Sequence, residues 1–417
     1  MARPKQHGGY ESFQYLEAGR DYTPYDVSRE ADRVPRFSVA LDAAEEARVE
    51  RLIEQCTMIS LHEHLGVFPH PVEDTPSYVR QGRMATAFRA LAESHWDAIF
   101  DNLMDGVCRI ESSSGWKWTE VLHDLGIRLC DIAHQDQVVP CHGVADILRA
   151  RESGKIGWMA SIEGAAMIEN ELDRIEILYG FGVRMLGVTY SEANALGSGL
   201  KEANDGGLTS FGRKAVERMN KVGMLIDCSH AGDRTTLDTI KASSKPIILS
   251  HIGARALWSS NRLAPDDVLR ACAEAGGVIG IEAAPHTTIT KQNRRHGIES
   301  FMEHFEYIAD LVGIDHVGFG ADTLYGDHVG LHRVYAAGLS LAESRSSAAV
   351  AKGGASAGAG AGDDEFPRVE YVEGLENPTE VSHNIVRWLV KHGYSDEDIA
   401  KVVGDNVLGL LRDVWVS

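Results

Sequence analysis

The chain has 417 residues, and its 61 acidic and 41 basic side chains give a formal net charge of −20. This balance, without a basic stripe, excludes an ordinary nucleic-acid partner. Residues 1–9 lack the apolar core of a signal peptide, and nowhere do eighteen apolar residues follow one another. We therefore expect a cytoplasmic protein with no membrane partner. Six scattered cysteines without a Cys-x-x-Cys pair indicate reduced thiols.

The length allows either one large α/β barrel with insertions or two ordinary domains. Residues 1–40 have weak periodicity, and we interpret them as an N-terminal extension to a barrel over residues 41–417. Apolar positions at helical spacing predict a helix from near Ala43 through Ile53, just before the first strand. Residues 70–155 mix helical patterns with loops such as 112–118, which we expect to wall the site.

From Ile156 onward short apolar strands alternate with amphipathic segments of helical character. A long series of this kind indicates a parallel sheet and favours a (β/α)₈ TIM-type barrel over an open sheet. The predicted strands are 158–164, 183–190, 224–230, 246–251, 277–281 and 316–322.

The C-terminal part begins with a change in composition. Residues 337–364 are rich in Gly, Ala and Ser and cannot bury enough apolar surface, so we predict a disordered insertion. Amphipathic helices are predicted over 381–392 and 396–415, the second with Ser395 as its N-cap.

The first strand, from Met58, ends in His62-Glu63-His64. Side chains alternate along a strand, so His62 and His64 share one face and both imidazoles approach one point. In a parallel barrel that point lies at the C-terminal mouth, where such barrels carry their chemistry. The pattern alone also fits two ordinary histidines at the end of a strand.

Four more polar residues fall at or just after the C-terminal ends of predicted strands: Glu163, His230, His251 and Asp322. Each alone has an ordinary explanation as a cap, a loop carboxylate or a satisfied core histidine. Together with the first pair they supply four imidazoles and two carboxylates, the donors that two zinc-like ions need. Paired ions under about 4 Å apart hold a hydroxide and stabilise an oxyanion. We therefore predict metal-assisted hydrolysis of an amide or a related bond, with a carboxylate as proton shuttle.

Competing motifs are weaker. Cys228-Ser229-His230 lacks an orienting partner at a readable spacing for a nucleophilic triad. Gly318-Phe319-Gly320 is only part of a dinucleotide fingerprint and comes late in the chain. Among the other histidines, His286, His304, His316 and His328 show no such convergence, and we interpret them as surface or structural residues.

Several passages make the chain similar to the membrane (renal) dipeptidase family, peptidase family M19, within the amidohydrolase-like barrels. They are Ser161–Gly164, Leu225–His230, Ser250-His251 with Arg255–Leu257, Gly313–Asp322 and Glu373–Pro378. The resemblance runs from about Ile53 to Val414 and is strongest after Lys155.

This resemblance implies that His62 and the residue at position 64 bind one zinc ion and that Glu163 bridges to a second. The second ion would be held by His230 and His251, and Asp322 would be the general acid/base. Arg262 matches the family's arginine for the substrate's terminal carboxylate, a task that suits a guanidinium fork. The family resemblance also implies a homodimer.

The chain departs from the family pattern at two positions. The family's first strand has His-x-Asp, whereas this chain has His64 at the third position, which leaves the site one unit more positive. Tyr190 stands in Thr189-Tyr190-Ser191 where the family has a histidine that polarises the substrate carbonyl. A tyrosine can donate a hydrogen bond, so we assign Tyr190 to catalysis and substrate binding.

These observations predict a binuclear hydrolase that cleaves dipeptides, with two divalent ions, zinc first and manganese or iron as alternatives. The same site acting on an N-acyl amino acid, a lactam or a lactone remains open, as does a catalytically silent barrel that binds a ligand.

Overall fold

A computed structural model describes residues 5–103, 117–285, 287–334 and 369–416. The predicted disordered insertion at 337–364, His286, Cys108 and residues 112–116 of the predicted wall lie outside these ranges.

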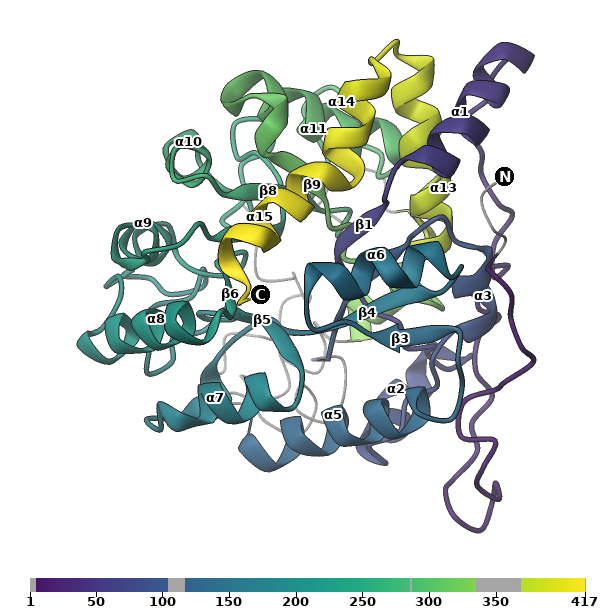
Figure 1. The fold of residues 1–417 in the computed structure, drawn as a ribbon, viewed down its shortest axis with the longest axis horizontal. Helices are drawn as coiled ribbons and strands as arrows, with labels where there is room; N and C mark the ends of the chain where they lie inside the picture. The colour runs from purple at the N-terminus through teal and green to yellow at the C-terminus, as the bar shows by residue number, and fades with distance from the viewer. Residues whose placement is uncertain (1–4, 104–116, 286, 335–368, 417) are drawn as a thin grey trace, which may run out of the picture.

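Eight parallel strands form a barrel in the order β1-β2-β4-β5-β6-β7-β8-β9. Two backbone hydrogen bonds join the segment after the last strand to the end of the first strand and the residue that follows it, from Asp322 N to His62 O at 3.1 Å and from His64 N to Thr323 O at 2.9 Å. Helices surround the strands (Figure 1). The predicted (β/α)₈ TIM-type barrel is therefore confirmed. The strands are β1 (Ile59–Glu63), β2 (Ala98–Asn102), β4 (Ile156–Ile162), β5 (Val183–Gly187), β6 (Leu225–Asp227), β7 (Ile248–Ile252), β8 (Val278–Ile281) and β9 (Val317–Phe319), with β3 (Val138–Pro140) beside the start of β4.

The helices of the described residues alternate with these strands after β3 and gather again at the C-terminus. Residues 328–334 are also helical. The others are α1 (Ala43–Gln55), α2 (Thr75–Arg80), α3 (Phe88–Glu93), α5 (Trp118–Ile132), α6 (Val144–Glu152), α7 (Asp173–Gly180), α8 (Ser210–Val222), α9 (Asp233–Ala242), α10 (Asp266–Glu274), α11 (Ile298–Val312), α13 (Pro378–Lys391), α14 (Asp396–Ala400) and α15 (Asn406–Val414). None of the helices in these ranges is both long and apolar enough to cross a bilayer.

The predicted C-terminal helices are present with small differences. Helix α13 begins three residues before the predicted start, because the side chain of Asn377 caps the helix and Pro378 suits its first turn. The predicted second helix is interrupted by a π-helical turn at Lys401–Asp405 between α14 and α15. Ser395 is its N-cap, as predicted, and accepts a hydrogen bond from Asp398 N.

Helix α15 closes the N-terminal end of the barrel. One hydrophobic cluster joins the first residues of several strands, among them Ile59, Ala98 and Ile248, to Leu411 and Trp415 at the C-terminus. Figure 1 shows α15 crossing the strands on this side. Apolar packing at this end leaves the opposite, C-terminal end of the strands for polar chemistry.

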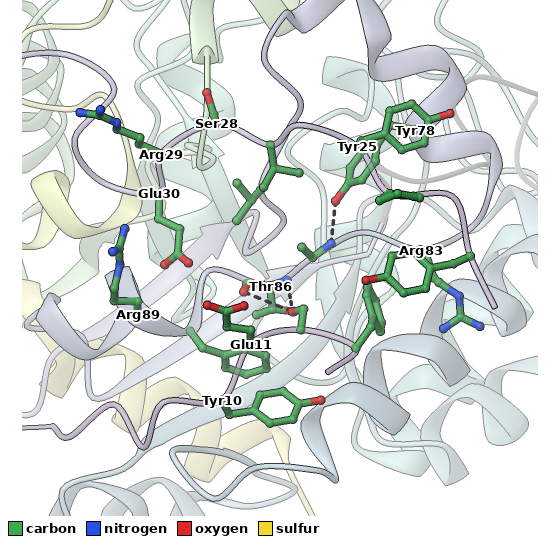
Figure 2. A pocket seen from close by; sticks show the side chains of 18 of the residues that line it. Tyr10, Glu11, Tyr25, Ser28, Arg29, Glu30, Tyr78, Arg83, Thr86 and Arg89 are labelled. Atoms are coloured by element: carbon green, nitrogen blue, oxygen red, sulfur yellow. Dashed lines mark hydrogen bonds between the residues drawn. The ribbon is translucent and has the colours of Figure 1, made fainter. Parts of the chain in front are cut away.

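The N-terminal extension, within residues 5–42, packs on the barrel without forming a helix or a named strand. Asp131 on α5 holds it by accepting hydrogen bonds from Tyr10 Oη at 2.6 Å, Ser12 Oγ at 2.7 Å and Phe13 N at 2.9 Å. A hollow of about 450 Å³ lies between the extension and residues 67–89, lined by Tyr25, Tyr78 and other side chains (Figure 2). The boundary of the extension at residue 40 stays a prediction.

Candidate active site

All six predicted metal ligands converge at the C-terminal end of the barrel. They follow or end the strands β1, β4, β6, β7 and β9, as the strand pattern predicted. The backbone is packed tightly where Glu163 leaves β4. A Cβ on Gly187, at the end of β5, would lie 1.8 Å from the carbonyl oxygen of Glu163, so only glycine fits there.

The first set of donor atoms surrounds one oxygen of Glu163. His62 Nε2 lies 3.0 Å from Glu163 Oε1 and 3.4 Å from Asp322 Oδ1. His64 Nε2 lies 2.9 Å from the same Asp322 oxygen and 3.8 Å from Glu163 Oε1. His62 and Glu163 are buried, whereas His64 and Asp322 keep a small exposed area.

The second set consists of His230 and His251, and His230 faces the other oxygen of Glu163. His230 Nε2 lies 3.4 Å from Glu163 Oε2 and 3.0 Å from His251 Nε2. The two oxygens of Glu163 thus point to different imidazoles, Oε1 to His62 and Oε2 to His230, and the ring centroid of His251 also lies 3.7 Å from that of His62. This is the arrangement that a bridging carboxylate needs.

The donor set fits divalent metal ions. One atom from each of His62, Glu163, His251 and Asp322 lies within 4.8 Å of the other three. Burial and hydrogen bonds to the two carboxylates act in opposite directions on His62, and the result raises its pKa to about 9. The carboxylates therefore attract a positive charge to this point, and a metal ion would supply that charge.

His251 is held in the tautomer that binds metals. Its Nδ1 lies 2.7 Å from Ser250 Oγ, and Ser250 Oγ donates its hydrogen to Asp227 Oδ2 at 2.6 Å. Nδ1 must therefore carry the hydrogen, and the lone pair of Nε2 is free to bind an ion. Burial also holds the pKa of His251 well below its usual range, so the ring is neutral.

Asp322 has an unusual backbone for a residue with a side chain. Its φ is +59°, in the left-handed region. Burial alone would raise the pKa of Asp322, but hydrogen bonds from His62 and His64 hold it well below its usual range. A strained, ionised carboxylate in a cluster of donors is typical of a functional site.

Tyr190 also lies at the cluster. Its ring stacks on that of His230, with centroids 4.2 Å apart and planes 19° from parallel. The structure therefore brings together the metal-ligand candidates and the tyrosine at the position where the family pattern has a histidine.

Arg262 lies behind the second set, but its guanidinium group is already engaged. It forms a buried ion pair with Glu282 and donates to the carbonyl oxygens of Ser229 and His251, each at 3.3 Å. Burial raises the pKa of Glu282 to about 7, which Arg262 partly opposes.

Two further residues of this region, Glu282 and Asn102, are not predicted by the sequence pattern. The amide of Asn102, the last residue of β2, donates to Glu163 Oε1 and lies 3.4 Å from His62 Nε2. Like the predicted ligands it is a polar residue at a strand end, but β2 was not recognised as a strand. The hollow beside the N-terminal extension contains none of the predicted ligands.

The competing nucleophile is contradicted by its surroundings. Cys228 is buried, and burial raises its thiol pKa well above the usual value, which disfavours the thiolate that a nucleophile needs. The five described cysteines are free thiols.

Comparison with known proteins decides the family. A model of the membrane dipeptidase family, peptidase family M19, matches residues 46–334. The chain belongs to the membrane dipeptidase family. The matched range contains all six predicted ligands.

Two relatives of this chain are named as dipeptidases. Dipeptidase tcpJ of Claviceps purpurea (strain 20.1) is 27% identical over 293 residues, which are 70% of this chain and 58% of that protein. Dipeptidase 3 of Rattus norvegicus is 29% identical over 203 residues, 47% of this chain and 40% of that protein. The match to these two dipeptidases therefore spans about half of their length.

A solved structure agrees on the fold. An amidohydrolase from Pseudomonas aeruginosa superposes with a TM-score of 0.67 at 23% identity, over 88% of this chain and 99% of that chain. This likeness supports the barrel that the membrane dipeptidase family model also implies.

Proposed function

We propose that this chain is a metal-dependent hydrolase that cleaves the amide bond of dipeptides. The observation that carries the proposal is the position of Glu163, whose two oxygens face different imidazoles, those of His62 and His230. Membership of the membrane dipeptidase family supports it. When bound, two divalent ions would supply a nucleophilic hydroxide at neutral pH and polarise the scissile carbonyl.

The ligand roles proposed for the chain follow from the two groups of donors. His62 and His64 would hold one ion, His230 and His251 the other, and Glu163 would bridge them. Because these donors are nitrogen and oxygen atoms, we propose zinc, with manganese and iron as alternatives.

Asp322 is proposed to move the proton. Its carboxylate is ionised and lies within hydrogen-bond distance of His64, at the edge of the donor cluster. It would accept a proton from the attacking water and return it to the departing amine. Tyr190, stacked on His230, would orient the substrate and donate its hydroxyl hydrogen to the carbonyl oxygen.

Arg262 is proposed to bind the substrate's terminal carboxylate. Because Glu282 already pairs with it, a substrate carboxylate would have to share or displace this internal one. The ion pair of Arg262 and Glu282 also favours a second candidate function. In that function the enzyme hydrolyses a substrate without a terminal carboxylate, such as a lactam or a lactone. An N-acyl amino acid carries a carboxylate and would meet the same competition as a dipeptide.

We also propose a homodimer located in the cytoplasm, without a nucleic-acid or membrane partner. The negative net charge supports the absence of a nucleic-acid partner. Light scattering of the purified chain measures the oligomeric state directly.

The test of function is amine release by zinc- or manganese-loaded protein across dipeptides with L or D C-terminal residues, N-acyl amino acids, lactams and lactones. Metal analysis accompanies it, and Asp322→Asn is the control. Dipeptide turnover that is lost in the variant supports the proposal. Turnover of lactones or lactams alone would favour the second candidate, and a protein without stoichiometric metal would contradict both.

A further inference from the structure

His328 is a buried histidine without a hydrogen-bond partner. Its side chain is fully buried, and neither ring nitrogen has a partner among the described residues. A buried polar group left in this state destabilises the fold, and native proteins rarely retain it without a reason.

The chain path places His328 at the mouth of the barrel. The segment after β9 runs beside the segment after β1, with hydrogen bonds from His64 N to Thr323 O at 2.9 Å and from Phe68 N to Tyr325 O at 2.9 Å. Asp327 then caps the helical residues 328–334 by accepting a hydrogen bond from Gly330 N at 2.8 Å. His328 is the first residue of that helix.

The electrostatic surroundings agree with this position. Burial lowers the pKa of His328 well below its usual range, and the charges of His332, His64 and His296 lower it further, while Asp322 opposes them. His328 is therefore a neutral imidazole, with one nitrogen able to donate and the other to accept.

We propose that His328 is a substrate-contact residue, and that polar atoms of the bound substrate supply the hydrogen bonds that its imidazole lacks. The inference rests on the proposed function. It departs from the interpretation of His328 as a surface or structural residue, of which burial excludes only the surface position. His304 offers a contrast, because it is equally buried but accepts a hydrogen bond from Ala254 N at 2.9 Å and donates to Ile289 O at 3.2 Å.

The test compares His328→Leu, His328→Gln and His304→Leu with the parent chain, all loaded with zinc. For the best substrate of the panel, His328→Leu is expected to lower kcat/KM about tenfold to a hundredfold, while His328→Gln retains more activity because its amide can still form a hydrogen bond. Metal content should stay unchanged. Without substrate, the midpoint of thermal unfolding should hold or rise in His328→Leu and fall in His304→Leu.

The outcomes separate this inference from the proposed function. An active parent chain whose kcat/KM is unchanged by His328→Leu would overturn the inference alone. A fall in unfolding temperature as large as that of His304→Leu would also overturn it, since that result assigns His328 a structural role. A parent chain that cleaves no member of the panel would overturn the proposed function and the inference with it.

Discussion

Ser250 fixes the orientation of His251 by accepting a hydrogen bond from its Nδ1 at 2.7 Å. Ser250 in turn donates to Asp227, so a carboxylate behind the serine makes the imidazole a better donor to a metal.

Replacement of Ser250 tests whether the hydrogen-bond chain from His251 through Ser250 to Asp227 strengthens metal binding. We expect Ser250→Ala to weaken zinc binding about tenfold to a hundredfold, because Nδ1 loses its acceptor and the ring is free to rotate. Competition with a chromophoric zinc chelator measures the change. Ser153→Ala, on an exposed helix end, is the control, and equal affinity in the two variants would contradict this role of the hydrogen-bond chain.

A substitution at Gly187 tests whether metal binding depends on the position of Glu163. A methyl group there would meet the carbonyl oxygen of Glu163 at 1.8 Å, so Gly187→Ala must displace β4 or β5. We expect a loss of stability of about 1–3 kcal/mol and incomplete metal loading. Urea unfolding and metal analysis measure both. Gly126→Ala on α5, where a Cβ meets nothing within 4 Å, should keep full metal content.

A substitution at Glu282 tests whether Arg262 binds the terminal carboxylate of the substrate. Replacing it with glutamine removes the internal carboxylate that competes with the substrate. We expect Glu282→Gln to lower KM several-fold for a dipeptide with a free terminal carboxylate and to leave KM for the corresponding dipeptide amide unchanged. Stability should fall, because the buried Arg262 loses its charge partner. Equal changes in KM for both substrates would contradict a contact between Arg262 and the substrate carboxylate.

The stacked pair His95 and His383 predicts a loss of stability in acid. Their centroids lie 4.0 Å apart, and burial followed by the charge of His383 lowers the pKa of His95 to about 2. The unfolded chain takes up a proton near pH 6.5 but the folded chain does not, so this contribution is present above pH 6.5 and is lost as the pH falls below it.

Urea unfolding between pH 7.5 and 5 measures this effect. We expect the free energy of unfolding to fall by up to about 1.4 kcal/mol per pH unit below 6.5 for one proton, and by less in His95→Gln. An identical slope in the variant would show that other groups account for the acid sensitivity.

Much of the fold and the site could be predicted because periodicity and strand ends are local features. Apolar runs located all six barrel strands after Lys155 and the first strand from Met58, and each predicted ligand is a polar residue directly following or ending such a run. The strand β2 was missed because it lies in a long irregular segment, and Asn102 was missed with it. Arg262 was identified, but its partner Glu282 was not, since they are twenty residues apart on different loops.

The sequence by itself determined the barrel class, the family and the six residues that meet at its mouth, because alternation along strands and the common direction of parallel strands place strand-end residues on one side. Only the tertiary structure decided which oxygen of Glu163 faces which imidazoles, which group pairs with Arg262 and which buried histidine lacks a partner. Hydrogen bonds and ion pairs act over a few ångströms, so they depend on side-chain positions that the spacing along the chain does not specify.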